Sequence, residues 1–134
     1  MRFAGYAALF DRVDRGGDVI RRGAFARAVA GGAGLPLLWQ HDAARPIGRV
    51  EHIAEDGRGL RVIGRLTGGG QGGEAAALLK AGAVSGLSFG YRVRQGRGAR
   101  PRELLDLDVV EVSLVTFPMQ PGARVHAVED GAPV

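Results

Sequence analysis

The sequence contains no cysteine among its 134 residues. Disulfide bonds and thiolate metal sites are therefore excluded, and a chain without disulfides is typical of a reducing compartment. No apolar run approaches the roughly 20 residues that a membrane-spanning helix needs. The N-terminus also lacks the long apolar core of a signal peptide. We therefore expect a soluble, intracellular protein.

Lysine is nearly absent as well, because Lys80 is the only one and arginine carries the rest of the positive charge. A formal net charge of +4 is compatible with a nucleic acid or an acidic protein as partner. The arginines are scattered, however, and aromatic residues that could stack on bases are not interleaved with them. The charge pattern thus argues against nucleic-acid binding as the main function.

Two segments suggest ligand sites that their details do not support. The glycine-rich segment at 68–73 precedes a predicted helix, but it lacks the Lys-Ser/Thr pair of a phosphate-binding P-loop, and Glu74 would oppose an anion. Asp14 and Asp18 lie in a turn with no third well-placed metal ligand. We interpret the first segment as a mobile loop beside a cleft and the second as a solvated turn. We expect no metal and no cofactor.

Short strand-like segments alternate with two short helical ones along the chain, with no repeat and no linker. The pattern predicts one domain over 1–134, with 127–134 as a frayed tail. We expect a β-rich α+β fold, a closed antiparallel or mixed β-barrel of about six or seven strands flanked by a few short helices. The predicted strands are 3–10, 19–20, 35–40, 47–53, 60–66, 84–94 and 104–116, with Val125 as a last strand residue, and the predicted helices are 25–30 and 74–80.

Two serines in the segment 84–91 are candidate nucleophiles. The odd spacing of Ser85 and Ser88 places them on opposite faces of a strand, so at most one can face a given partner. Leu87 and Phe89 would be buried on one face, while Ser88 shares the other face with glycines that would leave it accessible. This pattern favours Ser88 as a serine of fixed orientation.

A base and an orienting acid must come from elsewhere in the chain. Of the three histidines, His41 follows a buried strand and precedes a proline-containing loop, whereas His52 lies in an alternating strand and His126 near the C-terminus. Glu111 lies inside a strongly apolar strand, where an acid is costly without a partner. From the residues alone, His41 could also be structural, and Glu111 could face water or an arginine.

Four motifs follow one another along the chain. They are Gly-Tyr-Ala at 5–7 with Asp-Val-Ile at 18–20 and Gly-Ala-Phe at 23–25, Leu-Trp-Gln-His-Asp at 38–42 with Pro-Ile-Gly at 46–48, Gly-Leu-Ser-Phe-Gly-Tyr at 86–91, and Glu-Val-Ser-Leu-Val-Thr-Phe-Pro at 111–118. Together they resemble the prohead, or capsid maturation, proteases of tailed phages. The resemblance covers residues 3–125, and that family is similar in fold to the herpesvirus assemblin proteases, which are β-barrels wrapped by helices.

The resemblance implies a serine endopeptidase with a Ser-His-Glu triad. Carried over motif by motif, Ser88 corresponds to the nucleophile and His41 to the general base. Glu111 stands where the herpesvirus enzymes have a second histidine, and so corresponds to the orienting group. The backbone of Met119 and Gln120 corresponds to the oxyanion hole.

The resemblance also implies a substrate and a place of action. Family members cut the scaffolding domain from the major capsid protein inside the immature capsid, and often cut themselves. The expected location is therefore the assembling procapsid in the bacterial cytoplasm, for a phage, a prophage or a gene transfer agent. The portal within the prohead and a second copy of the chain, as a homodimer, are further candidate partners. The competing hypothesis is a catalytically inactive barrel that is capsid-associated or binds nucleic acid.

Overall fold

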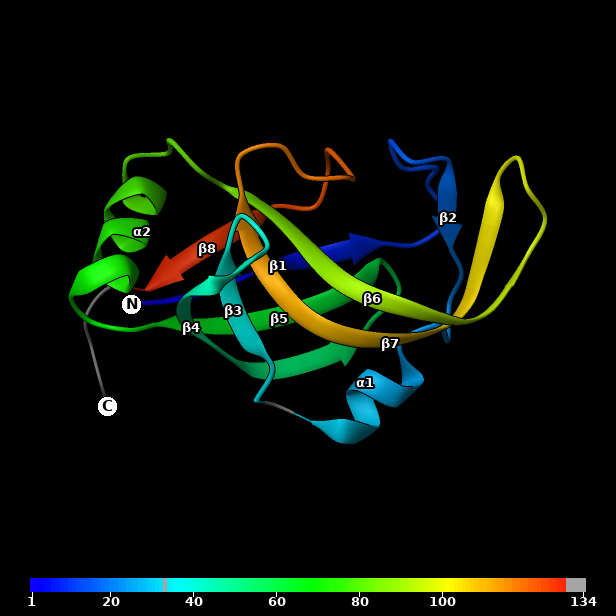
Figure 1. Cartoon of the computed structure of the whole chain (residues 1–134), viewed down its shortest axis with the longest axis horizontal. Coiled ribbons are helices and arrows are strands. Elements are labelled where there is room, and N and C mark those ends of the chain that lie inside the picture. The colour runs from blue at the N-terminus through cyan, green and yellow to red at the C-terminus, as the bar shows by residue number, and fades with distance from the viewer. Residues whose placement is uncertain (33, 130–134) are drawn as a thin grey trace.

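The computed structural model describes residues 1–32 and 34–129 of the chain. Within these residues, short helices accompany a strongly twisted sheet whose long strands β6 and β7 cross the molecule (Figure 1). The elements are β1 (Arg2–Leu9), β2 (Asp18–Ile20), α1 (Ala26–Gly31), β3 (Pro36–Trp39), β4 (Asp42–Glu55), β5 (Gly59–Leu66), α2 (Gly70–Lys80), β6 (Gly86–Arg97), β7 (Arg102–Val115) and β8 (Val125–Glu129).

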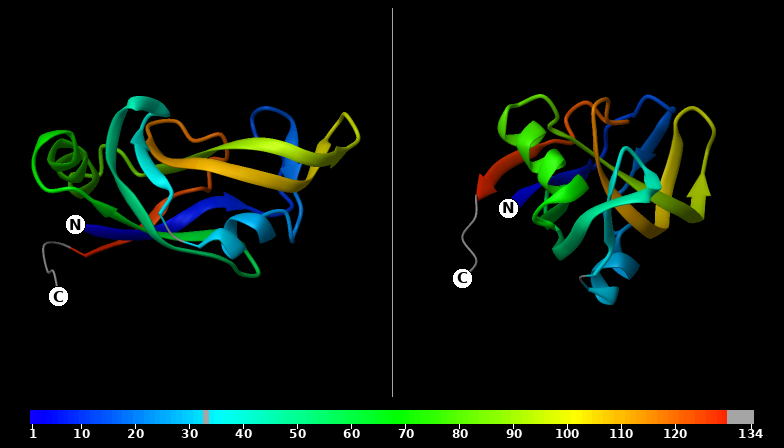
Figure 2. Two further views of the ribbon diagram at one scale, coloured as in Figure 1. Left: turned by 60° about the horizontal axis from the view of Figure 1, so that its bottom comes forward. Right: turned by 60° about the vertical axis from the view of Figure 1, so that its left-hand side comes forward.

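Strand β7 is the centre of the sheet that carries the site. One of its edges pairs with β6 along almost the whole length of both strands, and the other pairs in parallel with β2 at one end and with β3 at the other. From β3 the sheet continues through β4, β5 and β1 to β8. This order brings the β3–β4 hairpin next to the end of β7, as both views in Figure 2 show.

The predicted closure of the barrel is wrong, and the sheet has eight strands rather than six or seven. Strand β8 pairs with β1, and β6 pairs with β7, but only an isolated bridge between Gly86 and Arg124 links the two ends within the described residues. The segment just before β8 contacts the start of β6, and β8 itself then pairs with β1. A continuous ladder between β6 and β8 therefore does not form. The α+β class and the β-rich content are confirmed.

Alternation along β6 and β7 separates the core from the candidate site. Leu87 and Phe89 of β6 point into the core, together with Val112 and Leu114 of β7. Residues of opposite parity lie on the other face, where β6 places a serine opposite Ser113. The core therefore fixes the strands that carry the polar residues, because a one-residue slip would turn every side chain to the wrong face.

Helix α2 begins earlier than the sequence predicts. Residues 70–73, expected to be part of a mobile loop, form its first turn. Gly72 explains how a glycine-rich segment packs there, since a Cβ at this position would lie 2.0 Å from Thr67 Oγ1 and 2.4 Å from the Thr67 carbonyl oxygen. Only glycine lets the helix approach the end of β5 so closely.

Other boundaries differ from prediction at the strand ends. Strand β4 starts at Asp42 rather than at 47, and β8 extends over five residues instead of one. Of the predicted tail, residues 127–129 belong to β8, and residues 130–134 lie outside the described part of the chain. Neither described helix is long and apolar enough to cross a membrane.

Candidate active site

His41 lies at the tip of the two-residue turn between β3 and β4. Trp39 pairs with Asp42, and both turn residues have positive φ, 52° for Gln40 and 62° for His41. Tight two-residue hairpins require positive φ angles at these positions, which are usually occupied by Asn or Gly. Non-glycine residues in this region are strained, and such strain is concentrated at functional sites.

Gln40 fastens this strained turn to the end of β7. Its backbone N–H donates to the carbonyl of Leu114 at 2.9 Å. Its side-chain Nε2 donates to Thr116 Oγ1 at 2.6 Å, and its Oε1 accepts from the Thr116 backbone N–H at 3.1 Å. Three hydrogen bonds from one residue therefore fix the turn and, with it, the direction of the His41 side chain.

Glu111 faces His41 from β7. Its Oε2 lies 2.7 Å from His41 Nδ1, and its Oε1 accepts a hydrogen bond from Ser113 Oγ at 2.5 Å. The His41 backbone N–H donates to the same Ser113 hydroxyl at 3.1 Å. Both oxygens of a carboxylate that is only 7% exposed are thus satisfied, and Nε2 is the imidazole nitrogen without a partner among the described residues.

The hydrogen bond with Glu111 raises the pKa of His41 above its usual value. Burial of the imidazole acts in the opposite direction, and the negative charge of the carboxylate adds to the increase. The arrangement therefore stabilises the imidazolium, which is the form that a general base adopts after it has taken a proton.

Ser88 lies on the same face of the sheet as Glu111. It pairs with Ser113 across the β6–β7 ladder, and Gly90 pairs with Glu111. The glycine makes room for the acid rather than for solvent, since a Cβ on Gly90 would lie 2.6 Å from Glu111 Oε2. Ser88 is only 8% exposed, so it is less accessible than expected from the glycines beside it.

Ser88 and His41 both line one small cavity of about 100 Å³. The Ser88 hydroxyl makes no hydrogen bond to another residue in the described part of the chain, so it is available to a partner in the cavity. The turn at Met119 and Gln120 forms another wall. The sequence thus predicted three polar side chains from separate segments that the fold gathers in one place.

The side chain of Gln120 fixes the turn that follows β7. Its Oε1 accepts from the Leu9 backbone N–H at 2.7 Å, and its Nε2 donates to the Leu9 carbonyl at 2.9 Å. The Met119 carbonyl accepts from the Arg15 N–H at 3.1 Å. Within the described residues the backbone N–H groups of Met119 and Gln120 have no hydrogen-bond acceptor, so both can donate to a ligand.

The remaining candidates lie elsewhere. The Ser85 hydroxyl accepts from Arg124 Nη1 at 3.1 Å outside the shared cavity. His52 is exposed on β4, and the ring of His126 lies 5.9 Å from that of Tyr6. No group of three metal-ligating side chains occurs among the residues that the structure describes.

Two residues of the site were not predicted from the sequence. Gln40 and Ser113 stand inside recognised motifs, but their contribution depends on hydrogen bonds to residues more than 70 positions away. The sequence does show Gln40, a non-glycine residue beside the candidate base, and Ser113, a second polar residue in the apolar strand of Glu111. It does not show which residues their side chains would bond to.

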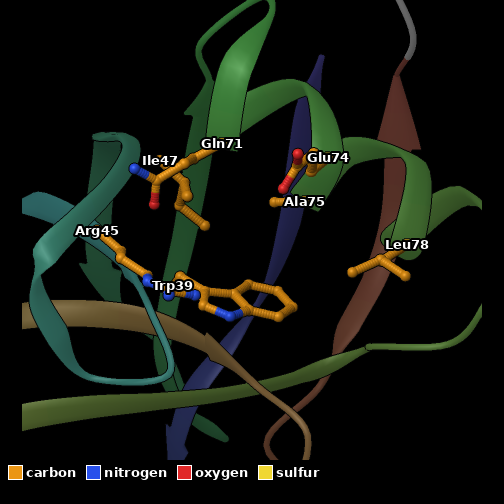
Figure 3. Close-up of a pocket in the computed structure, with 7 residues that line it drawn as sticks. All are labelled: Trp39, Arg45, Ile47, Gln71, Glu74, Ala75 and Leu78. Atoms are coloured by element: carbon orange, nitrogen blue, oxygen red, sulfur yellow. The ribbon is translucent and has the colours of Figure 1, made fainter.

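A larger cavity of about 290 Å³ lies between the β3–β4 hairpin and α2 (Figure 3). Trp39 and Arg45 line it from the hairpin side, and Glu74 and Leu78 from α2. A cleft beside the glycine-rich segment was predicted, and Gln71 does line this cavity. Neither Ser88 nor His41 does, so the larger cavity is separate from the candidate chemistry.

Comparisons with known proteins point to one family. A family model described as Caudovirus prohead serine protease matches residues 1–132. The prohead protease of Enterobacteria phage HK97 is 33% identical over 138 residues, covering 95% of this chain and 60% of that protein. The capsid polyprotein of Pseudomonas phage PAJU2 is 30% identical over 105 residues, covering 71% of this chain and 16% of that protein. The chain spans less than two thirds of the length of either relative.

Solved structures show the same fold. The bacteriophage T4 capsid assembly protease superimposes with a TM-score of 0.67 at 16% identity, over 85% of this chain and 80% of that one. The KSHV protease, solved with a hexapeptide phosphonate inhibitor, gives 0.65 at 13% identity, over 92% and 63%. The varicella-zoster virus protease gives 0.57 at 19% identity, over 92% and 62%. Since the family model matches residues 1–132, this chain belongs to the caudovirus prohead serine protease family.

Proposed function

We propose that the chain is a serine endopeptidase in which Ser88 is the nucleophile, His41 the general base and Glu111 the group that orients His41. The observation that carries the proposal is the 2.7 Å contact between His41 Nδ1 and Glu111 Oε2, made by a histidine that shares a cavity with Ser88. A base held by a third group beside a hydroxyl is the arrangement that activates a serine.

The proposed reaction is acyl transfer. His41 Nε2 takes the hydroxyl proton as Ser88 Oγ attacks the peptide carbonyl carbon, and Glu111 stabilises the resulting imidazolium. The imidazolium then gives its proton to the leaving amine as the C–N bond breaks. Water, deprotonated by His41, releases the acyl group and restores the serine. None of these steps requires a metal or a cofactor.

The turn after β7 is the proposed oxyanion hole. Met119 and Gln120 line the same cavity as Ser88, and their backbone N–H groups, unpaired among the described residues, are the proposed donors to the oxyanion. The buried side chain of Gln120 holds the turn against Leu9, so the donors are fixed before the substrate arrives. Pro118 cannot contribute, because proline has no backbone N–H.

The free edge of β6 is the proposed docking place for the peptide. After Leu87, which donates to the carbonyl of Ala123, this edge has no strand partner in the described residues, whereas the other edge is paired with β7. An extended peptide could add as a strand along the free edge and bring a carbonyl to Ser88.

The relatives suggest the biological substrate. One is named a prohead protease and another a capsid polyprotein. We infer that this chain cuts a major capsid protein with a scaffolding region inside the assembling procapsid. The same hypothesis includes cleavage of the chain by itself, and the portal and a second copy of the chain as partners. The net positive charge does not favour a nucleic-acid-binding alternative, because many arginines are paired with carboxylates, as Arg2 and Arg65 are with Glu51.

Co-expression with a major capsid protein that carries its scaffolding region tests this function. The wild-type chain should yield a shortened capsid protein with one new N-terminus, identified by sequencing the product. Ser88→Ala should leave the capsid protein intact, and Ser85→Ala is the matched control that should still cut. An intact capsid protein with all three chains would contradict the proposal and favour a binding role.

A further inference from the structure

The cavity beside Ser88 has a chemical character that the reaction alone does not require. At about 100 Å³ it exceeds several times the roughly 30 Å³ that a water molecule occupies in the liquid. It can therefore receive one side chain of a substrate. Its lining decides which kind of side chain that is.

Most of the wall is apolar. Ala7, Ile20 and Phe89 line the cavity together with Met119. Such a wall suits the methylene groups of a long side chain, which can lie along apolar surface while its polar end reaches further.

Asp14 is the one carboxylate that lines the cavity, and no lysine or arginine lines it. Asp14 Oδ1 accepts from the backbone N–H groups of Gly16 and Asp18 at 2.8 and 3.0 Å. Asp14 Oδ2 has no partner among the described residues. One carboxylate oxygen of this half-buried residue, which lines the cavity, is therefore left without a partner among the described residues.

The neighbouring acid does not share this property. Asp18 is held by Arg102 through two hydrogen bonds of 2.8 Å, so its charge is matched locally. Tyr91 also lines the cavity and donates to Asp18 Oδ2 at 3.3 Å. Burial first, then the charges of Asp18 and Asp14, raise the pKa of Tyr91. The negative charge of Asp14 is thus felt at the cavity wall.

We propose that this cavity selects a basic side chain, lysine or arginine, at the substrate residue whose carbonyl Ser88 attacks, with Asp14 as the residue that determines this specificity. The apolar wall contacts the methylene groups, and the free Asp14 oxygen and the Tyr91 hydroxyl oxygen accept from the cationic end. This inference rests on the proposed function, because it needs Ser88 to be the nucleophile.

Covalent phosphonate probes test the proposal without requiring a known cleavage site. Three peptidyl diphenyl phosphonates would differ only in the side chain next to phosphorus: lysine-like, norleucine-like and glutamate-like. A plain fluorophosphonate without a side chain measures the reactivity of Ser88 alone. The second-order rate of inactivation should be highest for the lysine-like probe and lowest for the glutamate-like probe.

Asp14→Asn is the decisive variant, because asparagine keeps an oxygen to accept from Gly16 and Asp18 while it removes the charge. Its rate with the lysine-like probe should fall about 10- to 100-fold, as expected for loss of a charged hydrogen-bond partner. Its rates with the norleucine-like probe and the plain fluorophosphonate should stay within about twofold. Asp56→Asn is the matched control, since Asp56 makes the same kind of turn contacts with Arg58 and Gly59 but does not line the cavity.

The outcomes separate this inference from the function on which it rests. No labelling of Ser88 by the plain fluorophosphonate overturns both. Labelling by that probe, with the lysine-like probe no faster than the norleucine-like one, overturns the specificity and leaves the nucleophile in place. Equal losses for both peptidyl probes in Asp14→Asn would give Asp14 a structural role only. The wild-type ranking decides the matter even if the variant does not fold.

Discussion

Glu111 is the residue on which we expect the chemistry of His41 to depend. A carboxylate at 2.7 Å from Nδ1 fixes the orientation of the ring and favours its protonated form. A general base must be neutral to take a proton, so activity should rise with pH through the pKa of His41. Because Glu111 raises that pKa, the rise should occur above the pH at which an ordinary histidine titrates.

Glu111→Gln tests this dependence at the level of one charge. The glutamine removes the charge that stabilises the imidazolium, so the pKa of His41 should fall and the acid limb of the profile should move to lower pH. The maximal rate should also drop by at least about 100-fold. The rate of fluorophosphonate labelling against pH measures both effects. An unshifted acid limb would contradict the role of Glu111.

From the sequence, the three candidate catalytic residues were easier to propose than their surroundings. The family motifs pointed to Ser88, His41 and Glu111, and the period of two along a strand favoured Ser88 over Ser85. The small exposed fraction of Ser88 was not predictable, because it depends on how Gly90 and Glu111 pack. Ser113 was not predicted for a similar reason. Its role depends on the hydrogen bonds of its hydroxyl with His41 and Glu111, which only the fold brings within reach.

At the scale of elements, the β3–β4 hairpin holds His41 in position. A strained turn keeps its geometry only when its surroundings hold it, and here Gln40 and Thr116 do so with two side-chain hydrogen bonds. The hairpin therefore belongs functionally to β7, the strand that carries Glu111. A substitution that loosens this hairpin should therefore alter the rate of the chemical step more than the binding of substrate.

Gln40→Ala tests whether the β3–β4 hairpin positions His41. It removes both side-chain contacts with Thr116, so the base should lose its alignment and kcat should fall about 10- to 100-fold, with KM changed by no more than about twofold. Thr116→Val removes only the hydroxyl and should have a smaller effect on kcat. The double variant should be little worse than Gln40→Ala, because the two residues form one contact. Unchanged kcat with a raised KM would assign Gln40 to binding instead.

Two adjacent glycines in α2 test the account of how that helix packs. Gly73 has no neighbour within 4 Å of an added Cβ, so Gly73→Ala should stabilise the helix by about 0.5–1 kcal/mol. Gly72→Ala would place its Cβ against Thr67 and should destabilise the fold by about 1–3 kcal/mol. Thermal unfolding of both variants measures the difference. Equal shifts of Tm would show that the close contact at Gly72 does not matter.

Element types were predictable because period and turn residues are local signals, whereas contacts between distant segments were not. The sequence indicated β2 at 19–20 and nearly the whole of β5. It gave no means to see that residues 70–73 would join α2, since the reason is a contact of Gly72 with Thr67. Barrel closure failed for the same reason, because it depends on pairing between β6 and the end of the chain.

At the scale of the whole molecule, the open sheet leaves a free edge beside the candidate catalytic residues. Strand β6 is secured on one side by β7 and is open on the other after Leu87 within the described residues. Many charges are paired across strands, as Glu103 is with both Arg21 and Arg97, whose contacts lower its pKa to about 2.

The position of a fluorophosphonate adduct tests whether Ser88 is the nucleophile. The intact chain would be labelled and digested, and the modified residue identified by tandem mass spectrometry, with Ser88→Ala and Ser85→Ala treated in parallel. We expect one adduct on Ser88, its loss in Ser88→Ala and its persistence in Ser85→Ala. An adduct that survives in Ser88→Ala and disappears in Ser85→Ala would contradict it.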